Sequence, residues 1–445
     1  MHPDVITWIG NLYTLAILIL FLSVGDQALG HAHILPTGAT IVCVALLVPY
    51  TIFALARPSG RQRIMLVLAT NVTALSFFSA MAILALVLST HPQAFWDEHA
   101  KWIMLLPYGL LVTVLATVLG YFWLNHLIFQ SAAFLSLVAI LGSILTDYLI
   151  PGTFAPLGTR PAGFSGNANF SALVAVCICA SAISFTSETA RYRIASTKAV
   201  LDYHPQGGLT LVDSVKNTLL FFITSLCIVL TMSRSGAIHL LSLYVFFSTY
   251  RVANSSKTFR SILHYTLVIP VLILAAAIGI MKTSKTSIIF EGNTRLMRML
   301  HNQQIDDGSA SSRFQAALDS LQLIEHAPLL GHGTGYARTM QELPHNLYLQ
   351  QWINNGIIGI LLFCGFLVAL FVTFARRAYP RGQALTLIAT TGSMFSHNLL
   401  DQRPFLILIG LALGYSLRSS SSLHIDLSHL ERYIGSKDRT GHNPS

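Results

Sequence analysis

The sequence predicts an all-α polytopic membrane protein with about 12 transmembrane helices and one long, partly helical periplasmic loop. Of its 445 residues, 53% are hydrophobic and only 10% are charged, whereas a soluble domain carries about 25% charged residues. Apolar runs of about 20 residues recur along the chain, and each can cross a hydrocarbon core of roughly 30 Å. The basic residues between these runs are also distributed unequally between the loops predicted on the two sides of the membrane.

The apolar runs are taken in order from the N-terminus. Val5 to Val24 has neither a basic flank nor a convincing small-residue cleavage site, so we predict a retained span rather than a signal peptide. The predicted spans are 5–24, 36–56, 64–89, 102–123, 127–146, 168–186, 215–232, 236–250, 262–281, 346–375, 383–400 and 404–418.

The loops between the spans predict the orientation. With the N-terminus inside, 17 of the 27 basic residues fall in short cytoplasmic loops or the tail and four in short outer loops, and the other six lie in 282–345. Short loops decide orientation, so both termini are predicted in the cytoplasm. The chain then divides into spans one to nine (1–281), a periplasmic loop with amphipathic helices (282–345), the last three spans (346–418) and a cytoplasmic tail (419–445).

Several classes of function are disfavoured. The net charge of +9 is typical of basic cytoplasmic loops rather than of a nucleic-acid partner. The outer carboxylates show no metal-ligand spacing, so we expect neither a catalytic metal nor a cofactor. "LLGHGTGYARTM" (residues 329–340) is a glycine-rich turn without the GK[ST] ending of a nucleotide-binding P-loop.

Two arginines stand out in the outer loops. Arg234 lies in "TMSRSG" between two apolar runs, where a charge is costly unless it faces a polar cavity or an anion. A turn whose arginine snorkels to the headgroups is the alternative. Arg160 lies in "LGTRPAGFSGNANF", which predicts a structured loop; an ordinary exposed charge is the alternative there.

Arg313 belongs to a predicted amphipathic helix, "SSRFQAALDSLQLIEHAP". Ser312 precedes Gln315 by three residues, as in a capping box. Arg313 would then be the first helical residue, beside unpaired backbone N–H groups that favour a phosphate. The alternative is an arginine on a solvated helix face.

"ELPHNLYLQQWINNGIIGI" (342–360) begins a span with a His-Asn pair. Pro344 is acceptable in a first helical turn, which would put His345 and Asn346 at the helix's outer end. Four amides follow, and they predict that the first turns line a wet cavity: Gln350, Gln351, Asn354 and Asn355. A neutral histidine there can take a proton from a hydroxyl. A histidine hydrogen-bonded at the interface is the alternative, and His397-Asn398 is a second candidate pair.

These motifs together resemble the O-antigen ligase and polymerase superfamily of bacterial inner-membrane glycosyltransferases, and within it most resemble the ligases. The matching segments are "TRPAGFSGNANF", "SRSG" and the long loop that ends in "PHNLYLQQWINNGIIGI". The resemblance implies a GT-C-like fold and a metal-independent, inverting transfer on the periplasmic side of the inner membrane. His345 would be the general base. Arg160, Arg234 and Arg313 would hold the pyrophosphate, and Asn346 would orient the histidine or the acceptor.

The implied reaction moves O-antigen from undecaprenyl pyrophosphate to lipid A–core, with membrane lipids around the protein and no nucleotide sugar. Polymerases share the loop motifs, so an O-antigen polymerase remains an alternative, as does a protein O-oligosaccharyltransferase. An anionic-lipid transporter is an alternative of a different class. Transporters often have paired, broken helices in related halves. The sequence shows no such symmetry, and the large outer loop favours an enzyme.

Overall fold

The computed structural model describes residues 3–31, 39–56, 58–87, 96–156, 160–185, 211–253, 308–340, 343–396 and 399–418. Within these residues the regular structure is all helical, with no strand. The predicted all-α class is therefore confirmed for the part of the chain that is described.

The helices coincide with eleven of the twelve predicted spans; the remaining one, 262–281, lies outside the described residues. The α-helices are α1 (Pro3–Leu22), α2 (Gly25–His31), α3 (Ala39–Ala56), α4 (Pro58–Thr70), α5 (Val72–Val87), α6 (Trp96–Phe122), α7 (His126–Leu149), α8 (Ala168–Ala182), α10 (Leu211–Thr231), α11 (Arg234–Ala253), α14 (Gly308–His326), α15 (Leu347–Arg376) and α16 (Pro380–Ser393). Residues 403–418 are also helical, and the 3-10 helices are η2 (Gly163–Ser165), η3 (Tyr336–Thr339) and η4 (Leu399–Asp401).

Three of the described helices are long and apolar enough to cross a membrane: His126–Leu149, Val212–Thr231 and Leu347–Arg376. A bent pair, Arg63–Thr70 with Val72–Ala85, would make a fourth. Other apolar helices are shorter. The structure thus has helices that are able to span a membrane, while the number twelve and the side on which each loop lies stay predictions.

The third predicted span, 64–89, is not one straight helix. Its two halves bend by 56° at Asn71, whose side chain donates to the carbonyl of Val67 at 2.9 Å and accepts from Thr117 at 3.1 Å. Asparagine side chains compete with the helix backbone for hydrogen bonds, and hydropathy alone does not reveal this break.

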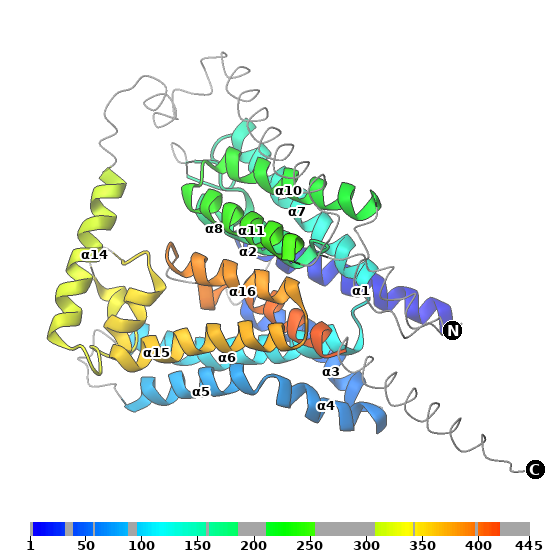
Figure 1. Cartoon of the computed structure of the whole chain (residues 1–445), viewed down its shortest axis with the longest axis horizontal. Coiled ribbons are helices and arrows are strands. Elements are labelled where there is room, and N and C mark those ends of the chain that lie inside the picture. Colours follow the sequence, from blue (N-terminus) through cyan, green and yellow to red (C-terminus); the bar gives the residue numbers. More distant parts are fainter. Residues whose placement is uncertain are drawn as a thin grey trace, which may run out of the picture.

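The long helices run alongside one another, and α14 crosses one end of the bundle (Figure 1). Glycines allow close packing between α6 and the helix at 403–418. A Cβ on Gly414 would lie 2.2 Å from the carbonyl oxygen of Thr117, and one on Gly410 would lie 2.5 Å from that of Thr113. Small residues at such positions let membrane helices approach closely.

An ion pair ties the N-terminal part of the bundle to its C-terminal helix. The Arg403 Nε atom lies 2.5 Å from a carboxylate oxygen of Asp26, which is almost fully buried. Burial raises the pKa of the Asp26 carboxyl, and the charge of Arg403 opposes this shift. Asp26 belongs to α2, which packs against η2 and therefore lies close to the loop that carries Arg160.

Candidate functional site

The end of α7 holds the described residues of the loop that follows it, 150–156 and 160–166, which include Arg160. Asp147, in the last turn of α7, accepts backbone N–H bonds at Oδ1 from Phe154 (2.9 Å) and Ala155 (3.1 Å) and at Oδ2 from Ala162 (2.8 Å). Its side chain is only 3% exposed. Because an ionised carboxylate forms strong charge-assisted bonds with N–H groups, the loop has a defined conformation, as its glycines and proline predicted.

From this loop, Arg160 reaches the turn between α10 and α11. Its Nη1 atom donates to the carbonyl oxygen of Met232 at 3.0 Å, and its Nη2 atom donates to Oδ1 of Asn169 at 3.3 Å. Met232 has a left-handed backbone (φ 50°), a strained conformation for a residue other than glycine. The arginine thus bridges two segments that are about 70 residues apart in the sequence.

Two helices begin at this contact, and each has a side-chain cap. Asn167 caps α8 by accepting from the N–H groups of Asn169 (3.1 Å) and Phe170 (3.2 Å). Ser233 caps α11 by accepting from the N–H of Gly236 (3.1 Å), and its hydroxyl donates to Asn169 Oδ1 (3.0 Å). The positive ends of two helix dipoles therefore meet next to Arg160.

Arg234 is the first residue of α11 and is exposed. The structure thus brings Arg160 and the "SRSG" turn together, while their common role in holding a pyrophosphate stays a prediction. Two arginines and two helix starts at one place make a positively charged surface that suits a phosphate or pyrophosphate group. We call the end of the bundle that carries this contact the site end.

His345 lies immediately before α15, not inside its first turn. The helix begins at Leu347, and Asn346 is its N-cap, with Oδ1 accepting from the N–H groups of Tyr348 (2.9 Å) and Leu349 (3.2 Å). The expectation that Pro344 starts the helix is therefore wrong, because Asn346 supplies the stronger start signal. His345 is exposed beside the helix start.

The amides of α15 mainly hold the glycine-rich turn that precedes the helix. Asn354 Oδ1 accepts from the N–H of Ala337 at 2.8 Å, and Asn355 Oδ1 accepts from the Thr334 hydroxyl at 2.7 Å. Asn355 also donates to Gln351 at 3.2 Å. Three of the four amides are thus explained by bonds within the protein, and this corrects the expectation that they line a wet cavity.

Gln350 is the exception among the four. It is fully buried, and neither atom of its amide has a hydrogen-bond partner in the described part of the chain. Buried polar groups are normally satisfied, so at this one residue the predicted wet cavity stays a prediction.

Arg313 occupies a different place in α14 from the one expected. The helix begins at Gly308, five residues before Arg313, so this arginine lies in the second turn and is exposed. The predicted capping box is also absent, because Gln315 Nε2 donates to Asp319 Oδ1 at 2.8 Å instead. Arg313 therefore does not lie at a helix N-terminus, and any part it has in anion binding would come from its own guanidinium.

Contacts through α16 show that α11 and α15 both begin at the site end. Tyr348, in the first turn of α15, donates its hydroxyl to the carbonyl of Thr390 on α16 at 3.0 Å. Beyond the end of α16, the ring of Phe395 lies 5.7 Å from the ring of His239 on α11. His345 and Arg234 therefore belong to the same end of the bundle, as their predicted common role requires.

Possible metal ligands are dispersed in the described residues, where no group of three or more His, Cys, Asp or Glu side chains could hold a metal ion. His326 and His332 bond to backbone carbonyls within their own segment. His397 and Asn398, the second candidate pair, lie outside the described residues.

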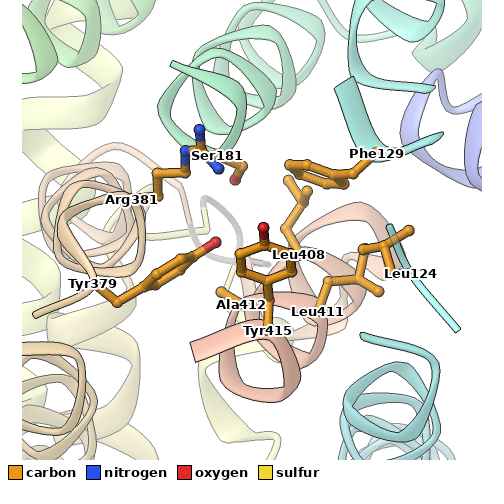
Figure 2. Close-up of a pocket in the computed structure, with 9 residues that line it drawn as sticks. All are labelled: Leu124, Phe129, Ser181, Tyr379, Arg381, Leu408, Leu411, Ala412 and Tyr415. Carbon is orange, nitrogen blue, oxygen red and sulfur yellow. The ribbon is translucent and has the colours of Figure 1, made fainter. Parts of the chain in front are cut away.

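A small pocket lies at the opposite end of the bundle (Figure 2). Phe129, near the start of α7, and Ser181, near the end of α8, border it, whereas Arg160 lies between the other ends of these helices. Arg381, Tyr379 and Tyr415 form its polar side. This pocket is therefore separate from the candidate site.

Part of this site lies in residues 219–364, which match the family model described as O-antigen ligase. The chain carries an O-antigen ligase domain. The match extends from α10 to the middle of α15 and includes Arg234, Arg313, His345 and Asn346. It confirms the predicted family and points to a membrane enzyme of the glycosyltransferase kind in lipopolysaccharide assembly. No curated protein matches the chain.

Arg160 lies outside the O-antigen ligase domain, yet its guanidinium bonds to Met232 within it. Sequence reasoning did not identify three residues that support the Arg160 contact: Asp147, Asn169 and Ser233. The two asparagines of "GNANF" offered a signal, because an asparagine before an apolar run predicts a helix cap. Nothing near Asp147 in the sequence indicated its bonds to a loop that follows it.

Proposed function

We propose that this chain is an O-antigen ligase that transfers polysaccharide from undecaprenyl pyrophosphate to a sugar hydroxyl of lipid A–core. The observation that carries this proposal is the contact of Arg160 with the turn before Arg234, where two helix starts also meet. In a membrane protein with an O-antigen ligase domain, such a positive surface is suited to a lipid-linked pyrophosphate.

The donor would bind through its pyrophosphate. Arg160 is half-buried and its guanidinium is oriented by Met232 and Asn169, so its charge is in place before the donor arrives. Arg234 is exposed on the first turn of α11, and Arg313 would supply a third positive charge from α14. Preorganised charges stabilise a leaving group that gains negative charge in the transition state.

The acceptor hydroxyl would be activated by His345. The imidazole takes the hydroxyl proton while the hydroxyl oxygen forms a bond to the anomeric carbon of the donor. The bond from that carbon to the pyrophosphate oxygen breaks, and undecaprenyl pyrophosphate leaves with the electron pair. A single displacement of this kind inverts the anomeric configuration, and general base catalysis contributes about 10²–10⁴-fold.

The proposed reaction takes place at the periplasmic side of the membrane and needs no metal ion. The active site would face the periplasm, in the inner membrane, with both termini in the cytoplasm. The arginines would take the place that a cation has in other pyrophosphate-releasing enzymes, so no metal would be needed. The polymerase and protein O-oligosaccharyltransferase alternatives differ from the ligase in the acceptor, and a transporter would break no bond.

Purified protein in lipid nanodiscs tests the proposal, with undecaprenyl-pyrophosphate-linked O-antigen as donor and EDTA present throughout. We expect lipid A–core to acquire polysaccharide, seen as a ladder on a gel. Elongation of a second lipid-linked glycan, with lipid A–core unchanged, would instead identify a polymerase. Activity that EDTA abolishes and Mg²⁺ restores would contradict the arginine-based reaction.

A further inference from the structure

We propose that Asp147 is a positioning residue for Arg160, because it fixes the loop that carries this arginine onto the end of α7. The inference rests on the proposed function, in which Arg160 holds the donor pyrophosphate. Asp147 lies outside the O-antigen ligase domain, and its side chain bonds to backbone groups of the loop.

The bonds of Asp147 lie on both sides of Arg160 in the sequence. Phe154 and Ala155 precede the arginine and donate to Oδ1, while Ala162 follows it and donates to Oδ2. One buried carboxylate thus holds both arms of the loop. Because an ionised carboxylate only accepts hydrogen bonds, three converging N–H groups suit it and would not suit an amide equally well.

The same loop is packed directly on α7 at Gly163. This residue has a left-handed backbone (φ +63°), and a Cβ there would lie 2.3 Å from Ser143 Oγ. The Ser143 hydroxyl in turn accepts from the N–H of Phe164 at 3.3 Å. The loop therefore has no room to shift towards α7, and the bonds to Asp147 keep it from moving away.

On its other side, the Arg160 guanidinium donates to Met232, in the turn of the O-antigen ligase domain, and to Asn169, in the first turn of α8. Asp147 and this turn thus fix opposite ends of one residue: the carboxylate fixes the backbone around Arg160, and the turn fixes its guanidinium. Loss of the Asp147 carboxylate would let the Arg160 guanidinium move out of its position, while the other side chains of the site would be unchanged.

A double-mutant cycle tests the coupling. The measured quantity is the dissociation constant of the donor, undecaprenyl-pyrophosphate-linked O-antigen, for purified protein in nanodiscs, in wild type, Asp147→Asn, Arg160→Ala and the double variant. Asn has the shape of Asp but replaces one acceptor oxygen with a donor. Asp319→Asn is the matched control, since Asp319 bonds only to Gln315 on its own helix among the described contacts. The melting temperature of each variant is recorded in parallel.

We expect Asp147→Asn to weaken donor binding about tenfold, Asp319→Asn to bind as wild type does, and the double variant to bind no more weakly than Arg160→Ala alone. An equal loss from Asp147→Asn in both backgrounds would overturn the inference, because the residue would then act independently of Arg160. If Asp147→Asn binds the donor as wild type does while Arg160→Ala binds it more weakly, the inference is overturned and the proposed function stands.

Wild-type binding by Arg160→Ala would contradict the proposed role of Arg160 and the inference together. If Asp147→Asn does not yield folded protein, Ser143→Ala removes a single bond to the same loop. A smaller loss of donor affinity is then expected, and it should again vanish in the Arg160→Ala background. Persistence of that loss in this background, or unchanged affinity in wild type, would overturn the inference.

Discussion

Gly356 is a non-helical residue inside α15 that packs against the glycine-rich turn, and its replacement by alanine should detach that turn. Its backbone lies at φ 63°, ψ −160°, a region open almost only to glycine. A Cβ there would lie 2.1 Å from the carbonyl oxygen of Leu329 and 2.3 Å from its carbon. Both atoms belong to the backbone, so no flexible side chain can move aside.

The expected magnitude has two parts. The disfavoured backbone conformation costs about 1–3 kcal/mol, and overpacking against Leu329 costs about 1–3 kcal/mol more. Gly356→Ala should therefore destabilise the protein by roughly 2–6 kcal/mol, which is a large share of a typical folding free energy of about 5–15 kcal/mol.

Gly365 is the matched control on the same helix. A Cβ at Gly365 meets no atom within 4 Å, and alanine favours a helix over glycine by about 1 kcal/mol. Gly365→Ala should be neutral or slightly stabilising. The two variants thus make the same chemical change in one helix with opposite expected effects.

Thermal unfolding in detergent can be followed with a dye that fluoresces on reaction with thiols, because four of the five free cysteines are buried. Gly356→Ala should unfold at a lower temperature than wild type, and a protease should cut its glycine-rich turn (329–340) faster. Equal unfolding temperatures and equal cleavage rates for the Gly356 and Gly365 variants would refute the close backbone contact.

Three further predictions address single residues. Arg234→Ala should lose nearly all transfer activity while Arg234→Lys keeps part of it, because only arginine offers two parallel hydrogen bonds to a phosphate; equal turnover of Arg234→Ala and wild type, at equal protein level, would return this residue to the snorkelling alternative. Gln322→Cys, exposed on α14, should react with a membrane-impermeant thiol reagent in cells with a permeabilised outer membrane, and labelling only after lysis would place this helix in the cytoplasm. Asn346→Ala should lower stability by about 0.5–2 kcal/mol through loss of the α15 cap, whereas Asn346→Asp should retain it; full stability with lost activity in the alanine variant would indicate substrate contact instead.

The positions of the helices could be predicted because apolar length is a local property of the sequence. α3, α7 and α15 lie within a few residues of their predicted spans, since a membrane span must satisfy its backbone hydrogen bonds internally. The non-helical residue Gly356 inside α15 was not predicted, because the N–H of the next residue, Ile357, bonds to the carbonyl of Pro328. The break at Asn71 could not be predicted this way, because it depends on a bond to Thr117 on another helix.

Candidate site residues could be predicted from their chemical type and their place in an outer loop. Residues whose part depends on hydrogen bonds to distant segments were missed. A histidine and arginines in outer loops indicated the family, and Arg160 does contact the turn before Arg234. The start of α14 was predicted wrongly, because the serines that suggested a cap at Arg313 are themselves helical. Asp147 was counted only as one more outer carboxylate, since its three partners follow it by seven, eight and fifteen residues.

The central claim is that His345 takes the proton while the arginines hold the donor, and one pair of measurements on purified His345→Ala tests it most directly. Binding of the donor, undecaprenyl-pyrophosphate-linked O-antigen, and its transfer to lipid A–core are measured side by side. His326→Ala, at an exposed histidine on α14, is the matched control. We expect His345→Ala to bind the donor as wild type does and to transfer about 10²–10⁴-fold more slowly, while His326→Ala transfers normally. Transfer by His345→Ala at the wild-type rate would contradict the claim, and loss of donor binding in this variant would make His345 a phosphate contact instead of the base.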